Sequence, residues 1–185
     1  MDLKKFSGIC GILAPLITFT LIFLSISTHS NFSWTNNCLS DLGVVPGNTE
    51  FLYNTAMISG GILALGFAFG LFSKTGKASA IIFILVALSL AAIGVFPGNA
   101  KPYHVIASSL FFILFPISML FAAKHFWKDR KLMALFTLAL VVITIAGGIL
   151  NEMGIFGPGC AIAEIIGAAC VGAWAAVLGI KMLQR

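Results

Sequence analysis

Six long stretches without Asp, Glu, Lys or Arg constrain the fold of this 185-residue chain more than any other feature. The stretches are 6–40, 51–73, 78–100, 102–123, 132–151 and 165–180. About 20 apolar residues suffice to cross the hydrocarbon core of a bilayer. The pattern therefore predicts an all-α polytopic membrane protein, with six transmembrane helices arranged as three hairpins in a single domain, 1–185. A hydrophobic content of 59% excludes an ordinary soluble domain.

The predicted spans are roughly 8–28, 51–73, 79–97, 103–123, 132–150 and 160–181. The first uncharged stretch is long enough for a span and a polar outer loop, which we place at 29–50. The sixth span reaches full length only if Glu164 lies inside it.

The charged residues divide unequally between the two sides of these spans. Ten of the eleven Lys and Arg residues fall on one side, and only Lys101 falls on the other. The positive-inside rule then places both termini in the cytoplasm and predicts a multi-pass protein of the plasma membrane. Contact with membrane lipids accounts for the net charge of +5, and nothing indicates a nucleic acid.

Four of the six acids and two of the three histidines lie on the opposite, outer side. Asp41 stands in a compact Ser-Asp-Leu-Gly run of the first outer loop, where it is a candidate functional carboxylate or the N-cap of a short helix. His104 opens the fourth span and is either a ligand or catalytic group or a hydrogen-bonded anchor. Glu164 lies in the last span, where an acid is costly and normally faces a cavity with a partner. The candidate partners of Glu164 are His104, Lys101 and polar groups of the first loop.

A faint repeat places one polar side chain in the first turns of each even-numbered span: Asn54, His104 and Glu164, six to eight residues after a proline. We therefore expect an outward-facing polar pocket. The residues expected to converge there are Asp41, His104, Glu164, Asn54, Asn37 and Ser40. Asp41, His104 and Glu164 are the catalytic candidates, and they are also the candidate ligands of a zinc ion.

Aromatic residues flank the spans at both interfaces. Tyr53 precedes Asn54 and Tyr103 precedes His104, so these tyrosines either belong to an aromatic belt or line a lipid-headgroup pocket. On the last span, Ala168, Gly172, Ala176 and Gly179 form a small-residue face of the kind that lets helices pack closely in lipid.

Of the four cysteines, Cys38 and Cys160 belong to outer loops, whereas Cys10 and Cys170 lie within spans. A disulfide between Cys38 and Cys160 is one interpretation, and the spacing alone leaves the pairing open.

Three segments together resemble a known family. They are Asn37-Cys38-Leu39-Ser40-Asp41-Leu42-Gly43, then Gly94-Val95-Phe96-Pro97 followed by His104, then Glu164. In this order they resemble the prokaryotic membrane proteins grouped as domain of unknown function 998. Members often have Glu-Arg where this chain has Glu164-Ile165, so any role of that arginine is missing here.

A more distant likeness is to the Frag1/DRAM/Sfk1 family, whose first outer loop has a similar motif to Ser40-Asp41-Leu42-Gly43. That resemblance implies lipid or GPI-anchor handling. Three functions follow from these observations as alternatives: binding of a lipid headgroup or amphiphile in the outward-facing pocket, metal-assisted hydrolysis of a membrane lipid, and proton-coupled transport of a small solute. Whether the protein is an enzyme is left open by the sequence.

Overall fold

A computed structural model describes residues 2–184. Among them are six long helices, one short 3-10 helix (η1) and no strand. Their bounds are α1 Leu3–Ser27, η1 Leu39–Val44, α2 Asn48–Lys74, α3 Lys77–Val95, α4 Tyr103–Phe126, α5 Lys131–Glu152 and α6 Ala161–Leu183. All six long helices are long and apolar enough to cross a membrane, which confirms the predicted fold class.

The helices extend beyond several of the expected span ends. The helix α1 begins at Leu3 rather than near residue 8, and α5 continues through Glu152. A helix does not have to stop where the hydrocarbon ends, because its backbone hydrogen bonds are internal on both sides of the interface.

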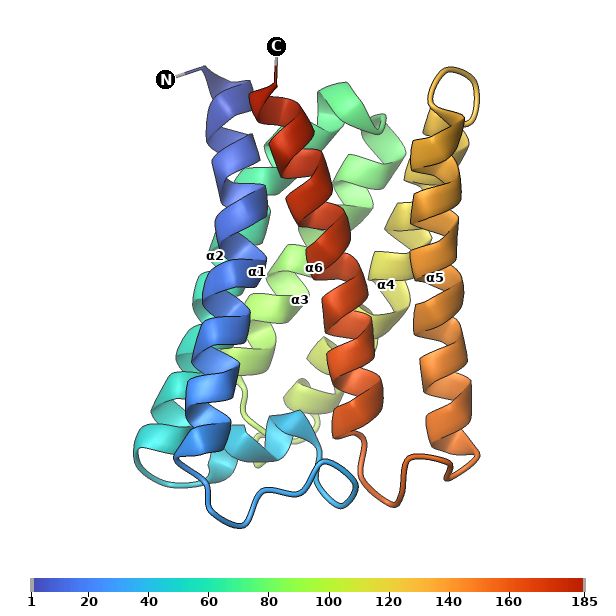
Figure 1. Ribbon diagram of the computed structural model, residues 1–185. Coiled ribbons are helices and arrows are strands. Elements are labelled where there is room, and N and C mark those ends of the chain that lie inside the picture. The colour runs from blue at the N-terminus through green and yellow to red at the C-terminus, as the bar shows by residue number, and fades with distance from the viewer. Residues whose placement is uncertain (1, 185) are drawn as a thin grey trace.

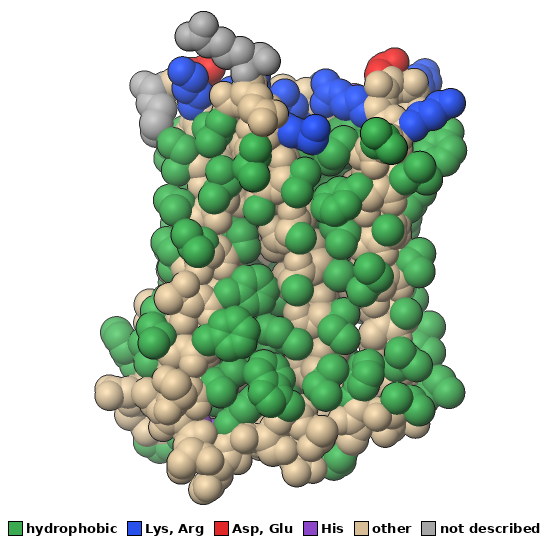
Figure 2. Space-filling view, in the orientation of Figure 1, with side chains coloured by type: hydrophobic (Ala, Val, Ile, Leu, Met, Phe, Trp, Pro, Cys, Tyr) green, Lys and Arg blue, Asp and Glu red, His purple; other side chains and the backbone are tan. Residues whose placement is uncertain are grey.

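Both termini lie at one end of the bundle, which we call the cationic end (Figure 1). Figure 2 shows lysine and arginine side chains along this end and a largely apolar surface below it. The opposite end, which we call the loop end, consists of the connections 28–47, 96–102 and 153–160. Large apolar side chains such as Leu16, Ile113 and Val142 are more than half exposed between the two ends, as expected for a surface that lipid covers.

The six helices form a closed ring in chain order. Each helix packs against the next, and α6 returns to pack against α1. Gly8 and Gly179 face each other where these two helices cross near the cationic end, and a Cβ on either glycine would lie within 2.8 Å of the other's carbonyl oxygen. The small-residue face predicted on the last span thus includes one close helix crossing, at Gly179.

Aromatic side chains fill the ring just past its middle, on the cationic side. Phe67 of α2, Phe83 of α3 and Trp174 of α6 pack with centroid separations of 5.5–6.1 Å, and none is more than 2% exposed. The indole Nε1 of Trp174 donates to Thr137 Oγ1 of α5 at 3.2 Å. This aromatic cluster separates the loop-end interior of the ring from the cationic end.

Candidate functional site

The connection between α1 and α2, which we call the first loop (residues 28–47), covers the loop end of the ring. Its short helix η1 points two leucines inward, and Leu39 and Leu42 are 3% and 0% exposed. Because its inner side is apolar, the first loop packs onto the bundle and covers the interior of the ring.

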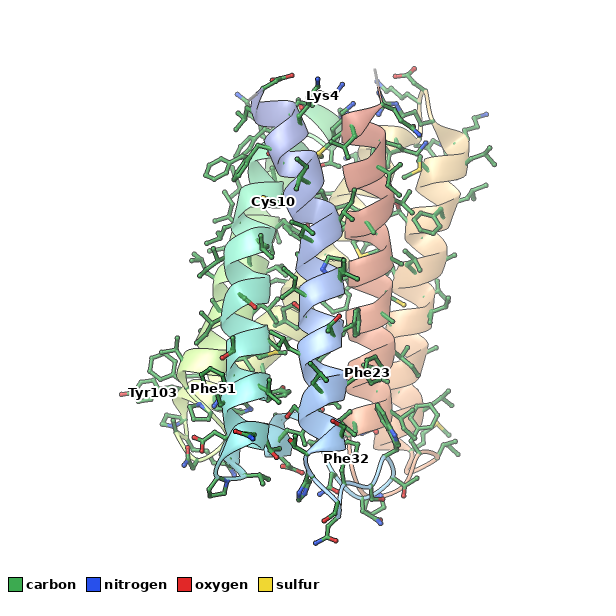
Figure 3. The ribbon with its side chains drawn as sticks, turned by 60° about the vertical axis from the view of Figure 1, so that its left-hand side comes forward. Lys4, Cys10, Phe23, Phe32, Phe51 and Tyr103 are labelled. Atoms are coloured by element: carbon green, nitrogen blue, oxygen red, sulfur yellow. A yellow bond between two sulfur atoms is a disulfide. The ribbon has the colours of Figure 1, made fainter. Side chains whose placement is uncertain are left out.

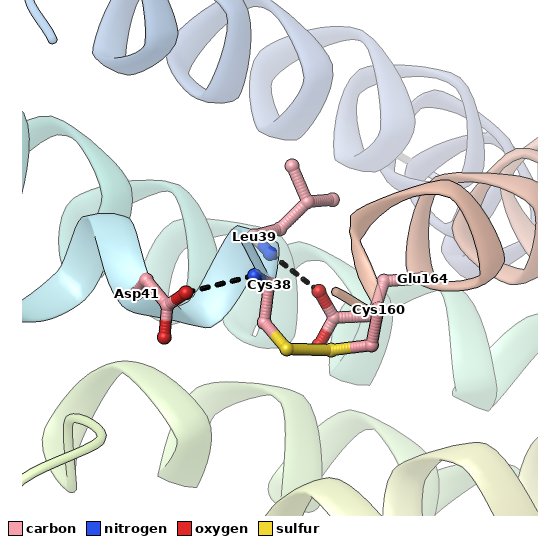
Figure 4. The surroundings of a disulfide bond; sticks show 5 residues. All are labelled: Cys38, Leu39, Asp41, Cys160 and Glu164. Atoms are coloured by element: carbon pink, nitrogen blue, oxygen red, sulfur yellow. Dashed lines mark hydrogen bonds between the residues drawn. A yellow bond between two sulfur atoms is a disulfide. The ribbon is translucent and has the colours of Figure 1, made fainter. Parts of the chain in front are cut away.

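Backbone hydrogen bonds and a disulfide attach the first loop to the start of α6. The amide of Gly159 donates to the carbonyl of Thr35, and the amides of Cys160 and Ala161 both donate to the carbonyl of Asn37, at 2.8–3.1 Å. These bonds satisfy amides that a helix N-terminus otherwise leaves free. Cys38 and Cys160 form a disulfide, with an S–S distance of 2.08 Å (Figure 4).

Two carboxylates hold the start of η1. Asp41 Oδ2 accepts a hydrogen bond from the Cys38 amide at 2.8 Å, and Glu164 Oε2 accepts one from the Leu39 amide at 2.5 Å (Figure 4). Asp41 therefore makes the capping contact that was one of its two interpretations. Among the partners considered for Glu164, the first loop is the one it contacts, through a backbone amide.

His104 links α4 to the end of α3. Its Nδ1 lies 2.8 Å from the carbonyl oxygen of Phe96, and a carbonyl only accepts, so Nδ1 bears the proton. The ring itself is 7% exposed. Nε2 makes no hydrogen bond within residues 2–184, so in the neutral ring it is a free acceptor.

A cavity of about 100 Å³ lies inside the ring, beneath the first loop. At the loop end it is lined by Leu39, Ser40, Tyr53, His104, Ser108 and Glu164. Further in, its walls are apolar, with small residues such as Ala14, Ala64 and Ala168 beside Phe19, Phe83 and Phe112. Along α6 the lining extends from Glu164 to Ala175, about 16 Å at the helical rise of 1.5 Å per residue.

We call Ser40, Tyr53, His104 and Glu164 the polar rim. They come from η1, α2, α4 and α6, so four elements converge at the loop end of the cavity. Ser40 Oγ, Tyr53 Oη and His104 Nε2 make no hydrogen bond to another residue among those the structure describes. The Glu164 carboxyl is bound by the Leu39 and Ser40 amides and keeps further lone pairs. Polar atoms beside an apolar cavity are normally paired, so the polar rim offers unused hydrogen-bonding capacity.

The other residues expected at the site lie elsewhere. Asn37 Oδ1 accepts from the Ser33 amide at 2.9 Å, within the first loop, and Asp41 is exposed beside the disulfide. Asn54 Nδ2 donates to the Gly43 carbonyl at 3.1 Å and so ties η1 to α2. Tyr103 is 60% exposed and points away from the bundle (Figure 3).

Asp41, His104 and Glu164 do not form a group with metal-ligand spacing within residues 2–184. The group that does have such spacing is Cys38, Cys160 and Glu164, whose candidate ligand atoms all lie within 4.8 Å of one another. Because the two sulfurs are joined in the disulfide, neither is a thiolate, the form in which cysteine binds metals.

Sequence reasoning missed the apolar part of the cavity. The signal was present in the small-residue face of α6: Ala168 and Gly172 line the cavity, whereas Gly179 packs against α1. Small residues leave space as readily as they permit close packing, and only the position of the facing helix distinguishes the two outcomes.

The fold and site define a multi-pass helical membrane protein with an internal, loop-covered cavity. The chain matches the family model described as "Protein of unknown function (DUF998)" over residues 12–181, so it belongs to that family. No curated protein and no solved structure matches it.

Proposed function

We propose that the protein binds a membrane amphiphile, whose polar head contacts the polar rim and whose hydrocarbon chain lies in the apolar part of the cavity. The observation that supports this most is the distribution of side chains along the cavity, with the polar rim at one end and mainly apolar walls beyond it. Apolar cavities of this order of size stay dry and take up apolar ligands.

The depth of the cavity also supports an amphiphile. About 16 Å is roughly half of the ~30 Å hydrocarbon core, the depth of one leaflet. The polar rim lies close to the loop-end interface, where lipid headgroups lie, because Tyr53 and His104 are in the first turns of α2 and α4. A lipid-derived chain would therefore keep its ordinary depth in the membrane when bound.

The closed inner end of the cavity does not favour transport. Phe67, Phe83 and Trp174 block the ring beyond the cavity. Most buried hydroxyls there pair with backbone or with each other, as Ser79 does with Ser118, and Ser7 Oγ is buried without a partner among the described residues. Hydrolysis has no specific geometric support in the arrangement of Asp41, His104 and Glu164.

We place the loop end outside the cell, with the cationic end and both termini in the cytoplasm of a plasma-membrane protein. The lysine and arginine bias supports this orientation. The disulfide at the loop end supports it independently, since disulfides persist in oxidising compartments and are rare in the cytoplasm.

Labelling of two variants, each with one added cysteine, tests the orientation. Lys101 and Lys128 are both exposed, one at each end of the bundle. We expect a membrane-impermeant maleimide to label Lys101→Cys in intact cells, and to label Lys128→Cys only after permeabilisation. The reverse pattern would overturn the orientation, and the free cysteines Cys10 and Cys170 are buried and should not contribute.

Fluorescence of Trp174 tests amphiphile binding, because this side chain is fully buried and packs on Phe83, which lines the cavity. In a Trp34→Phe/Trp127→Phe background, Trp174 is the remaining tryptophan. We expect ω-bromododecanol, added to the protein in lipid nanodiscs, to quench this fluorescence saturably, since a bromine at the inner end of the cavity would lie beside Phe83, which packs on Trp174.

Two neighbouring alanines give a matched pair for this experiment. Ala168 lines the cavity and Ala169 is exposed on the lipid side of the same helix. Ala168→Phe should abolish saturable quenching by occupying the cavity, and Ala169→Phe should leave it unchanged. Equal quenching in the two variants, with both shown to be folded by circular dichroism, would contradict the proposal.

A further inference from the structure

The cavity lining can carry a negative charge but has no permanent positive charge. It contains one acid, Glu164, one histidine, His104, and no lysine or arginine. Lys101, the one cation at the loop end, is exposed on the α3–α4 turn and does not line the cavity. A phosphate or carboxylate head would lose its water beside Glu164 without gaining a cation, which is strongly unfavourable.

The hydrogen-bonding atoms of the polar rim are mainly acceptors. Glu164 accepts from the Leu39 amide through Oε2, and the Ser40 amide also contacts this carboxyl, which still has lone pairs to accept a further hydrogen bond. His104 donates from Nδ1 to the Phe96 carbonyl, which leaves Nε2 as an acceptor. The Ser40 and Tyr53 hydroxyls can donate or accept, so they adapt to either kind of head.

Resting on the proposed function, we infer that the bound amphiphile has a single hydrocarbon chain and a head that donates hydrogen bonds and has no negative charge, such as an alcohol or a primary amine. Donors on the head would pair with the Glu164 carboxyl and His104 Nε2. An amine would in addition neutralise Glu164 and lie near the face or the hydroxyl of Tyr53, a favourable position for a cation. A cavity of about 100 Å³ has no room for two chains side by side.

A head-group series with a constant tail tests this inference. We would titrate ω-bromododecanol, ω-bromododecylamine and ω-bromododecyl phosphate into the Trp34→Phe/Trp127→Phe protein in zwitterionic nanodiscs, and compare quenching of Trp174 at equal mole fraction in the bilayer. We expect the alcohol and the amine to reach half-maximal quenching at a mole fraction at least tenfold lower than the phosphate. Half-maximal quenching by the phosphate at an equal or lower mole fraction would overturn the inference.

The variant Glu164→Gln tests whether Glu164 determines which head group is preferred. Glutamine keeps an oxygen for the Leu39 amide but removes the charge and replaces the second acceptor oxygen by an NH2 donor, so the amine should lose its advantage over the phosphate. Glu152→Gln, which removes an exposed acid at the end of α5, should change none of the three titrations. An unchanged ranking in Glu164→Gln would also overturn the inference.

The two proposals fail differently in this experiment. If amphiphile binding itself is wrong, none of the three ligands quenches Trp174 in a way that Ala168→Phe prevents. If only the proposed class of head group is wrong, Ala168→Phe still blocks every ligand that binds, but the phosphate is among the ligands that bind most tightly. A dialkyl analogue of the best head should bind at least tenfold more weakly, and equal binding would contradict the single-chain assignment.

Discussion

Removal of the disulfide by Cys38→Ser together with Cys160→Ser is expected to lower the free energy of unfolding by about 2–5 kcal/mol. The bond joins residues 122 positions apart and fixes the first loop to the start of α6. Without it, the loop is held to α6 by the backbone hydrogen bonds that Thr35 and Asn37 accept from the start of α6 and by the contact between Glu164 and Leu39. We therefore expect the first loop to open more readily and the thermal midpoint to fall.

Thermal unfolding in detergent, with and without a membrane-permeant thiol reductant, measures this effect. The reductant should lower the midpoint of the wild-type protein towards that of the double variant and should not affect the double variant. Cys170→Ala is the control, because this buried thiol is not bonded and its loss should leave the response to reductant in place. A double variant as stable as the wild type in the oxidised state would show that the backbone contacts alone hold the loop.

Gly179→Ala is expected to destabilise the ring where α1 and α6 cross, by about 1–3 kcal/mol. An added Cβ would lie 2.6 Å from the carbonyl oxygen of Gly8, a backbone atom that cannot move aside as the end of a side chain can. The two helices would have to separate, and this contact is the one that closes the ring.

Gly148→Ala is the matched control for this prediction. Gly148 is also inside a long helix, α5, but a Cβ there meets nothing within 4 Å. Alanine favours the helix over glycine by up to about 1 kcal/mol, so this variant should be as stable as the wild type or more so. The measurement is the thermal midpoint of both variants in the same detergent, and a Gly179→Ala protein that unfolds no earlier than Gly148→Ala would contradict the close packing.

The number and type of helices were predictable from the sequence, because uncharged stretches of this length have one stable form in lipid. The direction in which each helix faces was not predictable. Tyr53 and Tyr103 occupy similar places at the starts of α2 and α4, yet Tyr53 is 5% exposed and Tyr103 is 60% exposed. Helices that are apolar on all sides have no polar stripe to show which face is buried.

The positions of the polar residues were also only partly predictable from the sequence. The repeat of Asn54, His104 and Glu164 correctly places all three at one end of the bundle, and two of them line the cavity. Asn54 instead bonds a backbone carbonyl of η1, and Asp41 caps η1. Asparagine and aspartate readily bond nearby backbone, and whether they do so depends on the path of the first loop, which hydropathy and charge do not determine.

The closure of the ring by α6 has a consequence for biogenesis. This helix is the last of the six in chain order, and it supplies the partner of α1, the cysteine that pairs with Cys38 and the carboxylate that holds Leu39. Without α6, a bundle of the first five helices would have a lateral gap between α1 and α5, beside the residues that line the cavity. Insertion of α6 closes that gap, so the cavity becomes enclosed only when α6 is in place.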